Sequence, residues 1–227
     1  DDNTVRVEDG VPDKETQEKL KKIYQQLDLK NVKAEAIRQL IQLSFLKVIR
    51  KDAIQANHQM TPDTIGLLMA FLIEKVTQNT KLETIFDPAV GTANLLTTVI
   101  NQLDKDEHDN IKGFGIDNDD SMLSVASVNV ALQYANVDLF HQDAVGALDI
   151  PQCDLAVSDL PIGYYPLDDN TKDYQTRAKK GHSYIHHLLI EQSMNYLKPG
   201  SFGVFLVPSS LFQTKETEGF VKWIHSV

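Results

Sequence analysis

One stretch, residues 85–96, decides the fold that this sequence predicts: Ile85-Phe86-Asp87-Pro88-Ala89-Val90-Gly91-Thr92-Ala93-Asn94-Leu95-Leu96. Residues 82–86 are apolar and partly β-branched, which is typical of a short buried strand. Pro88 prevents the strand from continuing, and Gly91 permits a positive φ or a close approach of the backbone. Apolar residues recur at helical spacing from Ala93 onward, at Leu95, Leu96, Val99, Ile100 and Leu103. The stretch therefore predicts a strand, a tight turn and a helix.

Such a turn places the free N–H groups of a helix N-terminus at the carboxyl edge of a sheet, where they can bind a carboxylate or a phosphate. A dinucleotide site needs three glycines, whereas this turn has Gly91 and only Ala93 where a second might stand. Asp87 would repel a phosphate and attract an ammonium or sulfonium group. The turn suits a ligand with one carboxylate and one or two positive centres, and S-adenosylmethionine fits that description. An ordinary strand-to-helix turn without a ligand is the alternative.

The composition is that of a globular protein, with 42% hydrophobic and 24% charged residues in a chain of 227. This length accommodates one α/β domain and a smaller element. The longest apolar run, residues 65–73, is too short to span a bilayer, and the single cysteine suits a reducing compartment. We therefore expect a cytoplasmic protein without a membrane segment. The net charge of −10 argues against wide, non-specific binding of duplex DNA.

Residues 1–57 are expected to form a helical region ahead of an α/β domain at residues 58–227. Residues 13–27 predict one amphipathic helix, and Asn31 is placed to cap a second helix that runs to about Ala56. The second helix gathers its apolar residues on one face: Ile37, Leu40, Ile41, Phe45, Val48 and Ile49. This region packs either on the main domain or on a partner. A homodimer through these helices or through an open sheet edge is one such arrangement.

Four further strands are predicted at residues 111–116, 137–140, 153–157 and 203–207, with helices between them. Asp117 follows the second strand, about twenty residues beyond the first turn, where an acid binds ribose hydroxyls in nucleotide sites. Asp119 and Asp120 suit the start of the next helix. Thr61 and Pro62 predict another helix start, with the Thr61 hydroxyl as the cap and Pro62 as the first helical residue.

Several motifs, in matching order, resemble the class I S-adenosylmethionine-dependent methyltransferases of the N6-adenine-specific DNA methyltransferase type. Asp-Pro-Ala-Val-Gly-Thr-Ala at residues 87–93 is similar to the family's Asp-Pro-x-x-Gly-x-Gly. Gln59-Met60-Thr61-Pro62 resembles its Gln-x-x-Thr-Pro, one residue tighter. Asp159-Leu160-Pro161-Ile162-Gly163-Tyr164-Tyr165 resembles its Asn/Asp-Pro-Pro-aromatic motif, in the form of a bacterial branch of YtxK-like proteins. The resemblance implies a doubly wound, mostly parallel sheet in the order 3-2-1-4-5.

The resemblance also implies S-adenosylmethionine as the cofactor. In the family, an acid at the position of Asp143 accepts a hydrogen bond from the adenine amino group, and the Ala144 N–H is a donor to the ring. Asn118 stands where an apolar residue often lies against the adenine. The residues expected to bind the cofactor are Thr61, Asp87, Pro88, Ala89, Gly91, Thr92, Asn94, Asp117, Asn118, Asp143 and Ala144.

For catalysis, the resemblance implies methyl transfer to a planar amino or amide nitrogen. Such a nitrogen is a poor nucleophile because its lone pair is delocalised, and two acceptors aimed at its N–H bonds stabilise the developing positive charge. Asp159 would supply a side-chain oxygen and Leu160 a carbonyl, while Pro161 stiffens the turn. Ile162 replaces the aromatic residue that stacks on the acceptor, so Tyr164 or Tyr165 would have to supply the ring.

The main hypothesis is methylation of adenine N6 in DNA or RNA. A protein glutamine-amide methylase, a non-catalytic cofactor-binding or interaction protein and, more distantly, an NAD-dependent enzyme are the alternatives. The segment 168–183 carries Lys and Arg and predicts either a solvated mobile loop or a lid over the substrate. His186-His187 lacks metal-ligand spacing, so no metal is predicted. A sheet of this class usually has seven strands, so the five predicted here indicate a truncated domain, disordered remaining residues or a sheet edge covered by a partner.

Overall fold

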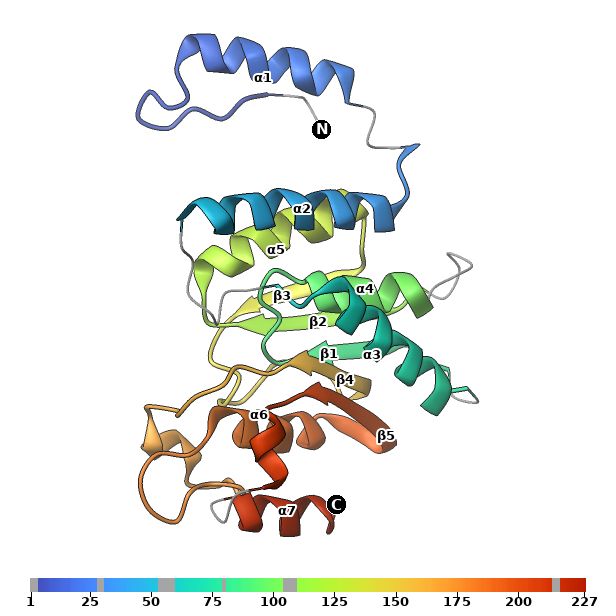
Figure 1. Cartoon of the computed structure of the whole chain (residues 1–227), viewed down its shortest axis with the longest axis vertical. Coiled ribbons are helices and arrows are strands. Elements are labelled where there is room, and N and C mark those ends of the chain that lie inside the picture. The colour runs from blue at the N-terminus through green and yellow to red at the C-terminus, as the bar shows by residue number, and fades with distance from the viewer. Residues whose placement is uncertain (1–3, 28–30, 53–59, 79–80, 104–109, 214–216) are drawn as a thin grey trace.

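The computed structural model describes residues 4–27, 31–52, 60–78, 81–103, 110–213 and 217–227. Its centre is one five-stranded sheet in the order β3-β2-β1-β4-β5, in which all neighbouring strands are parallel (Figure 1). The strands are β1 (Thr84–Asp87), β2 (Lys112–Asp117), β3 (Val137–His141), β4 (Cys153–Asp159) and β5 (Leu197–Leu206). The predicted strand order is confirmed.

Helices cover both faces of the sheet, and the central strands are therefore buried on both sides. The α-helices are α1 (Lys14–Gln26), α2 (Ala34–Asp52), α3 (Asp63–Val76), α4 (Asn94–Leu103), α5 (Asp120–Gln133), α6 (Ile185–Asn195) and α7 (Glu218–Ile224). Two 3-10 turns, η3 (Asp168–Thr171) and η4 (Ser209–Phe212), lie in the C-terminal half. None of the helices that the structure describes is long and apolar enough to cross a bilayer.

Two hydrophobic clusters lie on opposite faces of the sheet. Ile85 of β1 packs with Leu155 of β4 and with α3, α4 and α5. The next residue along each strand, Phe86 and Ala156, packs instead with α6 and α7. Successive side chains of a strand point to opposite faces, so each central strand contributes to both clusters. The helices on the two faces therefore bury β1 and β4 from both sides and hold the ends of these strands in place.

The N-terminal helices differ from each other in packing. Helix α2 contacts α4 and α5 and forms part of one helical layer (Figure 1). None of the α1 residues, all of which are described, is buried. The predicted apolar face of α2 is partly wrong, since Leu40 is 55% exposed while Arg38 is fully buried. Val48 and Ile49 lie outside the residues whose side chains are described, so their place on that face stays a prediction, as does the domain boundary at residue 57.

Strand β5 begins at Leu197, six residues before the predicted start at Gly203. Lys198, Pro199 and Gly200 lie in this additional part of the strand. The register shifts between the pairs Cys153–Leu197 and Leu155–Phe202, so these residues form an irregularity within the strand. A proline is tolerated there because it lies at a bulge and has no N–H to leave unpaired.

The segment between β4 and α6 is anchored to the domain at a few buried residues, while most of residues 168–183 are exposed, as expected for a solvated loop. The buried carboxylate of Glu191 on α6 accepts hydrogen bonds from the backbone N–H groups of Gln175 (2.9 Å) and Thr176 (2.7 Å). The Tyr174 hydroxyl donates to the Val145 carbonyl at 2.7 Å. Its function as a lid stays a prediction. The last helix starts at Glu218.

Candidate active site

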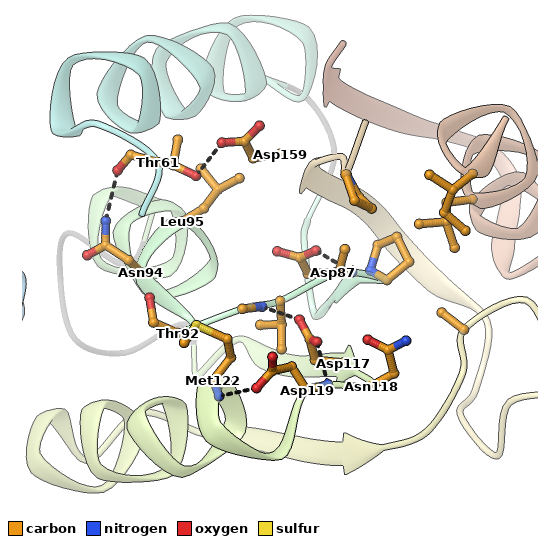
Figure 2. A pocket seen from close by; sticks show the side chains of 18 of the residues that line it. Thr61, Asp87, Thr92, Asn94, Leu95, Asp117, Asn118, Asp119, Met122 and Asp159 are labelled. Carbon is orange, nitrogen blue, oxygen red and sulfur yellow. Dashed lines mark hydrogen bonds between the residues drawn. The ribbon is translucent and has the colours of Figure 1, made fainter. Parts of the chain in front are cut away.

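A cavity of about 300 Å³ lies at the carboxyl edge of the sheet, between the ends of β1, β2, β3 and β4 (Figure 2). Parallel strands bring side chains from distant parts of the sequence to this edge. Every residue expected to bind the cofactor lines the cavity: Thr61, Asp87, Pro88, Ala89, Gly91, Thr92, Asn94, Asp117, Asn118, Asp143 and Ala144. Asp159 and Pro161 line it as well. Leu160 and Tyr164 are not among the described residues that line the cavity.

The turn after β1 is held by hydrogen bonds from its backbone N–H groups to the Asp87 side chain and to β2. The Ala89 N–H donates to Asp87 Oδ1 at 3.0 Å, and the Val90 N–H donates to the Ile116 carbonyl at 2.8 Å. Gly91 has a φ of +52° and open space where a Cβ would stand, so a ligand can approach its backbone. Ala93 adopts a φ of +59°, an uncommon conformation for a residue with a Cβ. The turn is thus set before any ligand arrives.

Strand β2 leaves room for this turn at Gly115, which the sequence analysis did not single out. A Cβ at this position would lie 2.7 Å from Val90 Cγ2, a distance that forces a neighbour to move. The glycine therefore allows the turn after β1 to pack directly on β2. A glycine inside a strand is the sequence signal for such a close approach.

Asp87 is the most deeply buried carboxylate of the cavity, at 1% exposure. Ser158 Oγ of β4 donates a hydrogen bond to Asp87 Oδ1, with 2.7 Å between the two oxygen atoms. Burial raises the pKa of Asp87 to about 7, and the nearby Asp117 and Asp159 carboxylates add to the rise. A positive group in the cavity would favour the ionised form, so this site suits a cationic ligand.

Asp117 ties the end of β2 to the turn after β1. Its Oδ2 accepts from the Gly91 N–H at 2.8 Å, and its Oδ1 accepts from the Asp119 N–H at 2.9 Å. Asp119 caps α5 by accepting from the Met122 N–H at 3.0 Å, as the charge pattern predicts. Asp119 and Met122 also line the cavity, which the sequence analysis missed because both belong to a helix start.

Asp143 is already engaged by the protein. Its Oδ1 accepts from the Val145 N–H at 3.0 Å, and its Oδ2 accepts from the Tyr165 hydroxyl, which also accepts from Asn170 Nδ2 at 3.0 Å. Burial and the bond to Asp143 raise the pKa of Tyr165 to about 12. Because the Tyr165 ring is buried beneath this network, it is not free to stack on an acceptor.

Asp159 ends β4 and points into the cavity opposite Thr61 (Figure 2). Thr61 Oγ1 donates to Asp159 Oδ2 at 2.8 Å. The expected cap is therefore wrong: Pro62 is the N-cap of α3, and the Thr61 hydroxyl is used in the site instead. Burial raises the pKa of Asp159, and the Thr61 hydrogen bond acts in the opposite direction. Gln59 of the same motif lies outside the described residues.

The side of the cavity beyond Asp159 exposes flat and apolar groups. Ile162 and Tyr164 are each 62% exposed. The Tyr164 ring stacks on Tyr184, with the ring centroids 4.8 Å apart and the planes at 21°. Leu160 is buried, and its N–H donates to the Leu206 carbonyl of β5 at 3.2 Å. The Asp159 turn is therefore followed by an exposed tyrosine, Tyr164, that stacks on the half-buried Tyr184.

Comparisons with known proteins agree with this geometry. The family model for N-6 DNA Methylase matches residues 45–223. The YtxK protein of Bacillus subtilis is 39% identical over 207 residues, which are 91% of this chain and 62% of that protein. A candidate class I S-adenosylmethionine-dependent methyltransferase of Listeria monocytogenes is 45% identical, with a TM-score of 0.89 over 95% of this chain and 67% of its own.

A more distant solved structure shares the fold. The type I restriction-modification methyltransferase subunit of Streptococcus thermophilus is 16% identical, with a TM-score of 0.62 over 74% of this chain and 38% of its own. The chain spans less than two thirds of the length of the Bacillus relative. The predicted resemblance is confirmed, and the relatives support S-adenosylmethionine as the cofactor. The chain belongs to the N-6 DNA Methylase family.

Proposed function

We propose that this chain binds S-adenosylmethionine in the cavity and methylates a planar exocyclic nitrogen, with adenine N6 in DNA or RNA as the acceptor. One observation carries the proposal: Asp87 and Asp159, from the neighbouring strands β1 and β4, line the same cavity. Ser158, the residue before Asp159, donates to Asp87, so the two acidic strand ends are directly linked. One carboxylate suits a cationic donor, and the other suits an amino group.

The cavity fits the cofactor in charge and in shape. Its carboxylates, Asp87, Asp117, Asp119, Asp143 and Asp159, favour a ligand with positive centres. We assign Asp87 to a positive centre, Asp117 to the ribose hydroxyls, and Asp143 with the Ala144 N–H to the adenine. The open space at Gly91 supports a close approach of the ligand to the backbone.

Asp159 is assigned to the acceptor. When bound, S-adenosylmethionine supplies an electrophilic methyl group. The Asp159 carboxylate would accept a hydrogen bond from the acceptor's amino group and stabilise positive charge on its nitrogen. Thr61 holds one carboxylate oxygen at 2.8 Å, which leaves the other oxygen for the acceptor. The Leu160 carbonyl is proposed as the second acceptor of hydrogen bonds, and Pro161 keeps the turn rigid.

Tyr164 is the proposed surface for the acceptor ring. Tyr165 is held by Asp143, and Ile162 has no ring, so Tyr164 is the aromatic residue of the motif whose face is open. Stacking on Tyr184 holds the Tyr164 ring in one orientation. Lys172, Arg177, Lys179 and Lys180 are exposed in the following segment and could contact phosphates of a nucleic acid.

The test measures binding first and transfer second. We expect calorimetry to show binding of S-adenosylmethionine and of its demethylated product. Labelled cofactor is then incubated with total nucleic acid and, separately, with total protein extract. Label on DNA or RNA supports the proposal, and label on protein indicates a glutamine-amide methylase. The absence of a binding signal at high ligand concentration would refute the proposed cofactor site.

A second candidate is a non-catalytic protein that binds the cofactor. Ile162 favours it, because this exposed aliphatic side chain stands where the motif has a ring that stacks on the acceptor. Binding of the cofactor without label transfer to either extract would support this candidate. An Ile162→Tyr variant sharpens the test, since it restores a ring at that position and would be expected to raise transfer if the acceptor is merely held poorly.

A homodimer through the N-terminal helices is also proposed. The amphipathic helix α1 buries none of its described residues, and an isolated helix of this length is marginal in water. Leu40, Leu43 and Leu46 of α2 are exposed and could cover the apolar side of α1 from a second copy. Light scattering on the full chain and on a Leu43→Glu variant tests this arrangement, since a monomer in both cases contradicts it.

A further inference from the structure

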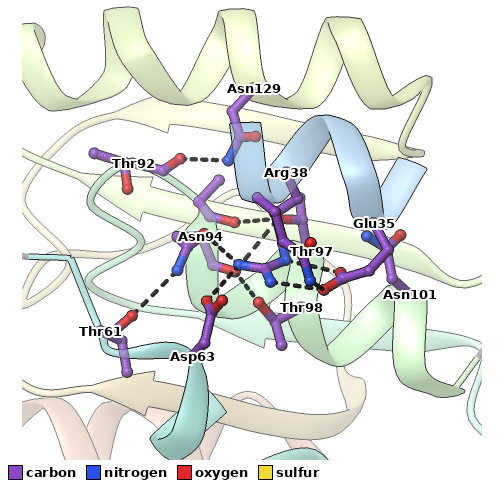
Figure 3. Close-up of polar contacts among 12 residues, drawn as sticks. Glu35, Arg38, Thr61, Asp63, Thr92, Asn94, Thr97, Thr98, Asn101 and Asn129 are labelled. Carbon is purple, nitrogen blue, oxygen red and sulfur yellow. Dashed lines mark hydrogen bonds and ion pairs between the residues drawn. The ribbon is translucent and has the colours of Figure 1, made fainter. Parts of the chain in front are cut away.

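A buried arginine outside the cavity, Arg38, is linked by hydrogen bonds to Asn94, and Asn94 is linked to Thr61 (Figure 3). Thr61 in turn donates to Asp159. Arg38 of α2 is 0% exposed, although arginine is almost never fully buried unless it is paired. Its Nε and Nη2 donate to the two carboxylate oxygens of Glu35 at 2.8 and 2.7 Å. Its Nη1 donates to Asp63 Oδ1 at 2.8 Å and to Asn94 Oδ1 at 2.9 Å. Arg38 therefore joins α2 to the first residues of α3 and α4.

The guanidinium fixes which way the Asn94 amide points. A guanidinium only donates hydrogen bonds, so the oxygen of the buried amide must face Arg38. The amide nitrogen then faces the other way and donates to the Thr61 carbonyl at 3.2 Å. A reversed amide would place two donors against each other at Arg38 and two acceptors against each other at Thr61. The orientation of Asn94 thus depends on Arg38.

Thr61 passes this constraint to the acid. Its carbonyl is held by Asn94, and Asp63, two residues further on, is held by Arg38, so the backbone that follows Thr61 is fixed at two points. Its hydroxyl donates to Asp159 Oδ2 at 2.8 Å. Thr61 and Asn94 line the cavity, whereas Arg38 is not part of the lining. Arg38 also lies outside residues 45–223, which the family model matches.

We infer that Arg38 positions the Asp159 carboxylate through Asn94 and Thr61, so that α2 contributes to the acceptor side of the site. Its catalytic meaning rests on the proposed function. A buried ion pair with a purely structural role is the alternative, and its loss would lower stability without a specific effect on Asp159. The two differ in what happens to Asp159 when Arg38 is removed from a chain that still folds.

The experiment follows the titration of Asp159 in the full chain, which requires neither cofactor nor acceptor. The carboxyl carbons of aspartate are labelled with ¹³C, and the Asp159 signal is identified with Asp159→Asn. Asp87 faces the same cavity and interacts with Asp159, so both signals are recorded. Thr61→Val removes the hydroxyl that favours the ionised acid, and should therefore raise the Asp159 pKa, while Thr61→Ser should restore it.

Arg38→Met should shift the Asp159 titration upward as well. In a chain that already carries Thr61→Val, the same change at Arg38 should have no further effect, because the connection is already broken. Glu35→Gln removes the ion pair with Glu35 but leaves the contacts of Arg38 with Asp63 and Asn94, so it should leave the Asp159 titration unchanged. Lys47→Met, on an exposed position of α2, is the matched control.

An unchanged Asp159 titration in folded Arg38→Met, or an equal additional shift on top of Thr61→Val, overturns the inference. If Arg38→Met does not fold, Asn94→Leu takes its place. This change removes the middle connection while Arg38 keeps Glu35 and Asp63, and an unchanged Asp159 titration, or an equal additional shift on top of Thr61→Val, again overturns the inference. Once an acceptor is known, Arg38→Met should lower the transfer rate about tenfold, more than it weakens cofactor binding. Failure of the unaltered chain to bind S-adenosylmethionine would count against the proposed function alone, since the titration is measured without it.

Discussion

The turn after β1 and the turn after β4 lie at the same edge of the sheet, yet they are held in different ways. The first is fixed by neighbouring backbone groups and by Asp117, which binds the Gly91 N–H. The second places Asp159 through contacts with residues far away in the sequence, since its partner Thr61 is 98 positions upstream. The cofactor side is therefore held by contacts with the adjacent strands of the sheet, and the acceptor side depends on how the helices pack.

This difference suggests that the two sides respond differently to substitution. Changes in the first turn should disturb cofactor binding through the local backbone. Changes behind the second turn should alter the acid while leaving the first turn in place, because Asp87 and the Gly91 turn keep their own partners. Affinity for the cofactor and the rate of transfer would then be lost separately.

The largest expected effect is on transfer. Asp159→Ala should lower the methyl-transfer rate by roughly 1,000-fold, because the acceptor nitrogen loses the oxygen that stabilises its positive charge. Cofactor affinity, measured by calorimetry, should change little. Asp169→Ala is the control, since that carboxylate is 90% exposed and pairs with Lys172 outside the cavity. Equal losses of transfer and cofactor binding in Asp159→Ala would contradict the division into two sides.

The next effect concerns stability where α6 packs on α7. His187 is 3% exposed and stacks on Phe220, with ring centroids 4.3 Å apart. Burial, with a smaller contribution from His186, lowers its pKa from 6.5 to about 4. Between these values the unfolded chain binds more protons than the folded one, so stability is full above pH 6.5 and falls as the pH decreases toward 4.

This loss should reach about 3 kcal/mol, measured by urea unfolding at a series of pH values. His187→Phe keeps a flat ring on Phe220 and removes the titrating group, so it should flatten that part of the pH profile. Other groups also titrate in this range, which is why the difference between the two proteins is the measured quantity. Parallel profiles in both proteins would show that His187 is not responsible.

A smaller effect is expected for the cofactor side. Asp117→Ala should weaken S-adenosylmethionine binding about 10- to 100-fold, because it removes the proposed ribose partner and frees the Gly91 N–H. Calorimetry measures the change, and Asp120→Ala, an exposed acid on the following helix, serves as the control. Transfer at saturating cofactor should be reduced far less than in Asp159→Ala.

The local pattern of the sequence predicted the turn at Gly91 and the acids Asp87 and Asp117. The strand order and the acids Asp143 and Asp159 were predicted from the resemblance of its motifs to the family. The sequence did not predict that the Thr61 hydroxyl would bind Asp159 rather than cap α3, since Asp159 is far from Thr61 in the sequence. The burial of Arg38 was missed for a similar reason, because its partner Asn94 is 56 positions away. Local propensity depends on residues that are close in the sequence, whereas these contacts form only once the helices have packed on the sheet.

The finest distinction between the two sides lies in the pH dependence of binding. Asp87 has a pKa of about 7 in the free protein because it is buried. A cation beside it favours the carboxylate, so binding below pH 7 must release a proton, and affinity for S-adenosylmethionine should fall about tenfold per pH unit between pH 7 and 5.5. Above pH 7 the acid is already ionised, and this dependence should level off.

Two controls isolate Asp87 as the cause. Methylthioadenosine lacks both positive centres, so its affinity should vary far less over the same range. Asp87→Asn cannot ionise, and it should bind S-adenosylmethionine more weakly and lose the dependence. Asp159 also has a raised pKa, but Asp159→Asn should retain most of the dependence if Asp87 is the group that meets the cation. If Asp159→Asn abolishes the pH dependence of binding and Asp87→Asn keeps it, the proposed roles of the two acids are reversed.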